Sequence, residues 1–209
     1  MAGLVLVWDM DNTLSGEYSD RITLNPNALR ILQKAIDAKR TGTVSAIFLL
    51  TNNSDLIYID KVRIELLKRL GLPENTPSPA PFNYIMPRQH MNRPQIFDPP
   101  KRLQDVEFMM MQVKKGVRGL ADRVFFFDDI PTHVLRNEIP QDHYIQINPP
   151  FTAGTADHTD YRAIEMSLSP YSGGRKANKK KRTQKGGSRI LKRSRYTQKK
   201  RRFTPKIDS

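Results

Sequence analysis

Short, mainly apolar runs that end in polar residues constrain the fold of this chain more than any other feature. The first run is Leu4–Trp8 and the second is Val44–Leu50, and residues 124–127 and 144–147 form two more. Runs of this length and composition are typical of strands buried on both faces of a parallel sheet. The sequence therefore predicts a mainly parallel sheet with polar residues at its strand ends.

Amphipathic segments between these runs predict helices. Asn25 supplies an N-cap and Pro26 occupies the first helical position, and the apolar residues that follow recur at helical spacing, so we expect a helix over residues 26–40. Residues 55–70 show the same spacing and are followed by Gly71, a common signal at the end of a helix. The start of the chain is therefore a β-α-β unit followed by a second helix.

The stretch from residue 72 to residue 100 contains eight of the 15 prolines, which excludes a long regular element and leaves room only for a short strand at 82–86. A helical pattern returns over residues 103–117. The resulting order, β-α-β-α-β-α-β-β, predicts an α/β fold. We expect a three-layer α/β/α Rossmannoid sandwich in one domain over residues 1–168.

Positive charge is concentrated in the last fifth of the chain. Residues 169–209 contain 16 of the 35 Lys and Arg residues but only one of the 21 acidic residues, whereas residues 1–168 are almost neutral. A segment with so few apolar side chains cannot offset its conformational entropy by burial. We therefore expect a disordered basic tail over residues 169–209.

Composition also excludes several classes of protein. The chain has no cysteine, so it cannot hold a disulfide, a cysteine-based zinc site or a thiol nucleophile. No basic segment precedes the first apolar run, and no segment reaches the roughly 18 to 20 apolar residues that cross a bilayer. We expect a soluble intracellular protein, in the cytoplasm or the nucleus, without a membrane partner.

Two carboxylates, Asp9 and Asp11, directly follow the first predicted strand. In open α/β sheets the ligand crevice lies at the carboxyl ends of the strands, so both side chains are expected there. One carboxylate at this spacing can attack phosphorus while the other protonates the leaving oxygen and later activates water. The alternative is that the pair only forms a turn.

The segment from Asp9 to Thr13 resembles the first motif, Asp-x-Asp-x-Thr, of the haloacid dehalogenase (HAD) superfamily, and the likeness extends over roughly residues 4–150. The resemblance implies a HAD-like phosphatase, a phosphoric monoester hydrolase with an aspartyl-phosphate intermediate. It implies that Asp9 is the nucleophile and a metal ligand. Asp11 would be the general acid and base and lend its backbone carbonyl to the metal, and Thr13 would brace the loop.

Two later segments match further motifs of that family. Thr51 closes the second strand and, by the resemblance, binds the transferring phosphoryl group together with backbone N–H groups near Asn52 and the next helix N-terminus. Asp128 would bind the metal, with Asp129 a second ligand directly or through water. Each segment has an alternative interpretation. Residues 51–53 could equally be a helix N-cap, and Asp128 and Asp129 could equally form a turn.

Electrostatics gives an independent reason to expect a metal. Each unit-charge pair at about 4 Å repels by about 4 kcal/mol in an effective dielectric of about 20, so several carboxylates would reject a phosphate dianion. Oxygen ligands favour Mg²⁺ over zinc. No metal role is expected for the histidines, which lack ligand spacing. They are His90, His133, His143 and His158.

The third motif of the family is a lysine that shields charge and orients the nucleophile. Lys101 is the favoured match, because it begins the predicted helix upstream of the third long apolar run, and it would also contact the substrate phosphate. Lys114 and Lys115 stay open as alternatives.

Little chain is available for a cap over the site. Only a short flap and one helix fit between Thr13 and Thr51, and the insertion at residues 72–100 is short. The resemblance therefore implies a minimal-cap member with an open crevice. Such a site suits a macromolecular substrate, a phosphoprotein or a nucleic acid end, although a phosphorylated small molecule stays open.

The basic tail predicts a second activity, because the Lys and Arg clusters in residues 175–206 should bind nucleic acid nonspecifically and with a steep salt dependence. A phosphatase domain with such a tail also resembles proteins of large DNA viruses, which would place it in a virion or viral factory. The alternative to an enzyme is a noncatalytic nucleic-acid-binding or virion protein that keeps the fold as a scaffold.

Overall fold

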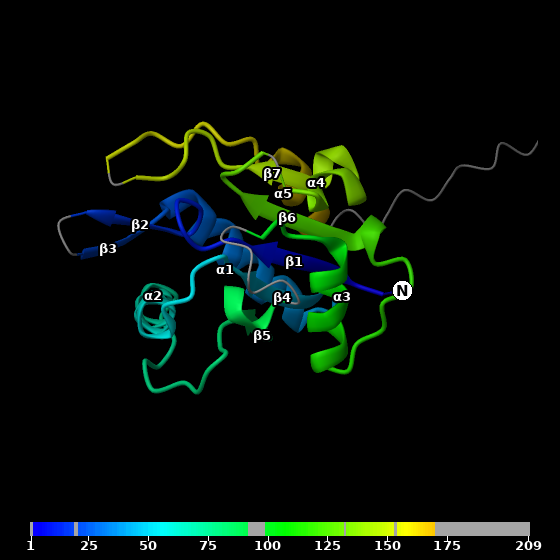
Figure 1. The fold of residues 1–209 in the computed structure, drawn as a ribbon, viewed down its shortest axis with the longest axis horizontal. Coiled ribbons are helices and arrows are strands. Elements are labelled where there is room, and N and C mark those ends of the chain that lie inside the picture. Colours follow the sequence, from blue (N-terminus) through cyan, green and yellow to red (C-terminus); the bar gives the residue numbers. More distant parts are fainter. Residues whose placement is uncertain (1, 19–20, 92–98, 132, 153, 170–209) are drawn as a thin grey trace, which may run out of the picture. The chain divides into compact units, whose positions relative to one another are not determined.

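A computed structural model describes residues 2–18, 21–91, 99–131, 133–152 and 154–169 (Figure 1). The strands are β1 (Leu4–Trp8), β2 (Ser15–Tyr18), β3 (Arg21–Leu24), β4 (Val44–Leu50), β5 (Tyr84–Met86), β6 (Val124–Asp128) and β7 (Tyr144–Gln146). The α-helices are α1 (Pro26–Arg40), α2 (Leu56–Arg69), α3 (Leu103–Gln112), α4 (Leu135–Glu138) and α5 (Arg162–Leu168). The predicted tail from residue 170 onward lies outside the described residues.

Five parallel strands form the main sheet in the order β5-β4-β1-β6-β7. Strand β1 is central, and its last residue, Trp8, pairs with Leu49 of β4 on one side and Phe127 of β6 on the other. Because all five strands run in the same direction, their carboxyl ends meet at one edge of the sheet. The residues that follow β1, β4 and β6 are thereby brought together.

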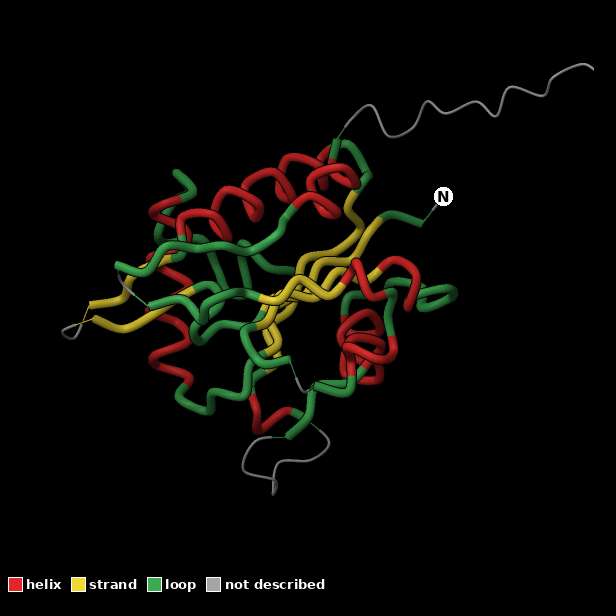
Figure 2. The backbone as a smooth tube through the Cα atoms, turned by 90° about the horizontal axis from the view of Figure 1, so that it is seen from above, coloured by secondary structure: helices red, strands yellow, loops and turns green. Residues whose placement is uncertain are grey.

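Helices cover both faces of this sheet (Figure 2). Leu6 and Trp8 on one face of β1 belong to a core that includes residues of α1, α2 and α5. Val5 and Val7 point to the other face and share a core with α3 and α4, as the two-residue repeat of a strand requires. The predicted α/β class, with a mainly parallel sheet between helices, is confirmed.

The first helix has the predicted bounds, and Asn25 Oδ1 accepts hydrogen bonds from the backbone N–H groups of Asn27 and Ala28. The third predicted helix is too long at its C-terminus. It ends at Gln112 instead of residue 117, because Lys114 adopts a left-handed backbone conformation with φ 54° that an α-helix cannot continue. Among the described residues, no helix has the length and apolar character needed to span a membrane.

A β-hairpin that the sequence did not predict as strands follows β1. Strands β2 and β3 pair antiparallel in a small sheet of their own, and β3 contacts α2 (Figure 1). The hairpin occupies the short flap expected between Thr13 and Thr51. Strand β3, Arg-Ile-Thr-Leu, alternates polar and apolar residues over only four positions, and β2, Ser-Gly-Glu-Tyr, does not alternate, so the pattern was too short to predict the hairpin.

Candidate active site

Asp9 lies directly after the central strand, where it is flanked by the ends of β4 and β6. Its backbone N–H donates to Phe127 O at 2.9 Å, which continues the pairing of β1 with β6 by one residue. The residue is only 5% exposed. Its side chain is therefore fixed at the carboxyl edge of the sheet, as the position of the Asp9–Asp11 pair after the first strand predicts.

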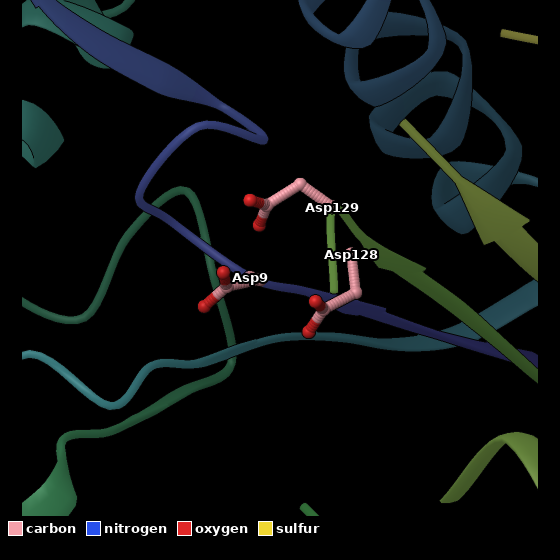
Figure 3. A group of neighbouring side chains, drawn as sticks. All are labelled: Asp9, Asp128 and Asp129. Carbon is pink, nitrogen blue, oxygen red and sulfur yellow. The ribbon is translucent and has the colours of Figure 1, made fainter. Parts of the chain in front are cut away.

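Asp128 and Asp129 bring two more carboxylates to the same place. Asp128 is the last residue of β6 and is fully buried, and its Oδ1 accepts a hydrogen bond from Ile130 N at 2.7 Å. One carboxylate oxygen from each of Asp9, Asp128 and Asp129 lies within 4.8 Å of the other two (Figure 3). The sequence-predicted acidic residues from two strands separated by more than 100 positions thus form one cluster.

Lys101 neutralises part of this cluster. Its Nζ lies 2.6 Å from Asp9 Oδ1 and 2.6 Å from Asp128 Oδ2, and the side chain is 1% exposed. The lysine precedes α3 and does not begin it, because that helix starts at Leu103. Of the three lysines considered from the sequence, Lys101 is the one in contact with these carboxylates, whereas Lys114 and Lys115 are exposed beyond the far end of α3.

Burial shifts the pKa values of all four groups. It raises the pKa of Asp9 to about 7, with the Lys101 ammonium opposing the shift and the Asp128 charge adding to it. Burial also raises the pKa of Asp128, and burial with the Asp9 charge raises the pKa of Asp129. For Lys101, burial would lower the pKa, but the charges of Asp128 and Asp9 outweigh burial and raise it. Lys101 therefore stays a cation beside three carboxylates that resist ionisation.

His133 contacts both Lys101 and Asp128. The buried His133 Nδ1 accepts a hydrogen bond from Lys101 N at 3.3 Å, and its Nε2 lies 3.5 Å from Asp128 Oδ2. The backbone carbonyl of Lys101 also accepts from Leu135 N at 2.9 Å. No sequence pattern selected His133, because its contact with Lys101 joins segments 32 positions apart along the chain.

The loop after β1 is a compact turn. The carbonyl of Met10 accepts from Leu14 N and Ser15 N, both at 3.0 Å, and Asn12 has a φ of 56°, a left-handed conformation that asparagine tolerates well. The buried Thr13 Oγ1 donates to Asp129 Oδ1 at 3.5 Å. Thr13 therefore links this loop to the β6 end, as expected for a residue that braces the loop.

Thr51 and the two asparagines after it follow β4 and lie next to the residues that follow β1. Thr51 is fully buried, and its Oγ1 accepts from Asn53 N at 3.0 Å. The side chain of Asn53 donates from Nδ2 to Asp11 Oδ2 at 3.2 Å. Asn52 lines the cavity beside Asp9, whereas Thr51 is not among the described residues that line it. The role of Thr51 toward a phosphoryl group stays a prediction, as does that of the Asp11 carbonyl toward a metal.

The following helix does not offer the anion site that we expected at its N-terminus. Asp55 is the N-cap of α2, and its Oδ1 accepts from Ile57 N at 2.9 Å and from Tyr58 N at 3.1 Å. These two N–H groups are therefore occupied by a carboxylate of the chain itself.

A cavity of about 280 Å³ opens onto the carboxylates. Its lining includes Asp9, Lys101 and Arg88. Arg88 belongs to a short 3₁₀ helix, Arg88–His90, and is tied to the loop after β4 by Arg88 N to Asn53 O at 3.2 Å and Arg88 Nη2 to Ser54 Oγ at 3.1 Å. Arg88 and Lys101 thus line the same cavity, a proximity that their separation along the chain does not reveal.

Comparison of the chain with protein-family models, with curated proteins and with solved structures found no match in any of the three.

Proposed function

We propose that this protein is a Mg²⁺-dependent phosphoric monoester hydrolase of the HAD type, which forms an aspartyl-phosphate on Asp9. The observation that carries the proposal is the gathering of Asp9, Asp128 and Asp129 around Lys101 at the carboxyl edge of a parallel sheet. The position of Asp9 directly after the central strand β1 also supports the proposal.

The donor set fits a divalent cation. Three carboxylates with oxygens within 4.8 Å of one another are opposed by one ammonium group, so the cluster carries excess negative charge when it is ionised. Asp9, Asp128 and Asp129 would hold Mg²⁺, whose preferred ligands are oxygens. When bound, the ion supplies positive charge that offsets the repulsion between these carboxylates and a phosphate dianion.

The protein's own residues account for the chemical steps. A carboxylate oxygen of Asp9 bonds to phosphorus while the bond from phosphorus to the leaving oxygen breaks, and Asp11 gives its proton to that oxygen. Asp11, held by Asn53, then takes a proton from water as the water attacks phosphorus and the bond to Asp9 breaks. Lys101 fixes Asp9 for attack, and Lys101 with Arg88 supplies positive charge beside the phosphoryl oxygens.

The test is hydrolysis of phenyl phosphate with Mg²⁺ or with EDTA. We expect Mg²⁺-dependent turnover by the wild type and a loss of about a thousandfold or more in Asp9→Asn, because the amide is not a nucleophile. Borohydride treatment during turnover should convert Asp9 to homoserine, detected by mass spectrometry. Asp122→Asn is the matched control, since this exposed aspartate lies before β6 at the opposite edge of the sheet. Equal background rates in every sample would end the enzyme proposal and favour the noncatalytic scaffold.

We also propose that residues 175–206 bind nucleic acid nonspecifically, on the basis of their charge. Binding of a mixed-sequence duplex to the whole chain should weaken steeply as salt rises, and removal of residues 170–209 should abolish it while sparing hydrolysis. Binding that survives this truncation would contradict the assignment.

A further inference from the structure

A second hollow of about 370 Å³ adjoins the cavity at the carboxylates. The two share a wall formed by Asp11, Asn12 and Asn53. Asp11 is the residue that would protonate the leaving oxygen. The leaving group of a substrate would therefore extend past Asp11 into the second hollow, which Asp9 does not line. The hollow runs between the base of the hairpin, at Ser15 and Gly16, and the first turn of α2.

The two hollows differ in charge. Both basic residues, Lys101 and Arg88, line the cavity at the carboxylates. Among the described residues, those that line the second hollow include no Lys or Arg, and their only charged members are Asp11 and Asp55. The cavity at the carboxylates therefore offers a phosphate two basic side chains beside its three acidic ones. The described lining of the second hollow offers only acidic charge to the group that the phosphate is attached to.

The N-terminus of α2 does not add a binding site for anions to this hollow. The first-turn N–H groups of Ile57 and Tyr58 are taken by the Asp55 carboxylate, so they are not offered to a ligand. The same turn carries two exposed apolar side chains, Leu56 at 54% and Ile57 at 72%. The half-buried Tyr58 adds an aromatic side chain to the lining. An acidic and apolar surface suits a peptide with basic or apolar side chains, and it repels the further phosphates of a polynucleotide.

We infer that the second hollow binds the polypeptide around a phosphorylated side chain, and that Asp55 selects substrates with basic residues beside the phosphate. The inference rests on the proposed phosphatase function and narrows its substrate class to phosphoproteins. Asp55 acts by charge on the leaving-group side and does not touch the reacting atoms.

The test compares three substrates with the full chain at 0.2 to 0.3 M salt, where the charged tail is largely screened. They are a phosphoserine peptide flanked by lysines, the same peptide flanked by glutamates, and a 5′-phosphorylated trinucleotide. We expect kcat/KM for the lysine peptide to exceed that for the glutamate peptide by about three- to fivefold, the range that one exposed ion pair supplies, and the trinucleotide to be no better than the glutamate peptide. Residual attraction by the tail favours the anionic substrates and so works against this expectation.

Asp55→Asn isolates the charge, because asparagine caps a helix about as well as aspartate does. The ratio between the two peptides should fall to about one in this variant and stay unchanged in Asp122→Asn. A wild-type ratio near one, a ratio that Asp55→Asn leaves intact, or a preference for the trinucleotide would overturn the inference while leaving the phosphatase standing. If phenyl phosphate is not hydrolysed, the proposed function fails on its own, and fluorescence anisotropy of the labelled peptides then reads the same selectivity as a ratio of affinities.

Discussion

The buried position of Lys101 leads to a strong prediction for Lys101→Met. The substitution keeps an unbranched side chain of similar length but removes an ammonium group that lies 2.6 Å from each of two carboxylates. Removing one partner of a buried ion pair typically destabilises a protein by about 3 to 5 kcal/mol. We expect a loss in this range for metal-free protein near pH 8, where the carboxylates left behind are forced to ionise.

The loss should depend on pH in a defined direction. Without the lysine, the pKa values of Asp9 and Asp128, which burial already raises, lose the strongest of the interactions that lower them. A carboxyl group whose folded-state pKa is raised contributes stability at low pH and loses it as pH rises through that pKa. Lys101→Met should therefore be destabilised less at pH 5 than at pH 8.

Urea unfolding in EDTA, followed by tryptophan fluorescence at both pH values, measures the effect. The chain has one tryptophan, Trp8, which lies in the core directly before Asp9. Lys115→Met is the control, because this exposed lysine should cost less than about 0.5 kcal/mol. A loss for Lys101→Met below 1 kcal/mol at pH 8, or the same loss at both pH values, would refute the reasoning.

Further predictions concern the metal, the core and the support behind the lysine. Asp9 has a pKa of about 7 without metal and must lose its proton to bind an ion. The apparent Mg²⁺ affinity, measured by calorimetry, should therefore rise by up to about tenfold per pH unit below pH 7 and level off above pH 7. An affinity that does not change with pH would contradict this prediction. Trp8→Ala should lower the free energy of unfolding in urea by about 3 to 5 kcal/mol, because the Trp8 ring stacks on the Phe127 ring with 3.7 Å between the ring centroids. A loss near 1 kcal/mol would show that this core tolerates the missing ring. His133→Leu leaves the Lys101 N–H without its acceptor and should cost about 1 to 3 kcal/mol and lower kcat more than it changes KM; an unchanged kcat would show that the histidine only packs.

Hydrophobic pattern and chain order were enough to predict the main sheet and most of its helices. The apolar runs at β1, β4, β6 and β7 are buried strands, and α1 has its predicted bounds. These elements follow from local rules, since a short, mainly apolar run favours a buried strand and a capped amphipathic segment favours a helix. The hairpin β2–β3 escaped these rules, because its apolar pattern is short and incomplete and its contacts with α2 are a tertiary feature.

The sequence by itself determined which carboxylates end up at the strand ends. Asp9, Asp128 and Asp129 each close an apolar strand, and parallel strands necessarily present their carboxyl ends at one edge. Only the tertiary structure decided what surrounds them. Segments far apart along the chain bring Lys101, rather than Lys114 or Lys115, to the carboxylates and His133 to Lys101. They also leave the described lining of the second hollow without a basic side chain. Their positions are fixed by packing and by the balance of buried charge, which no local pattern encodes.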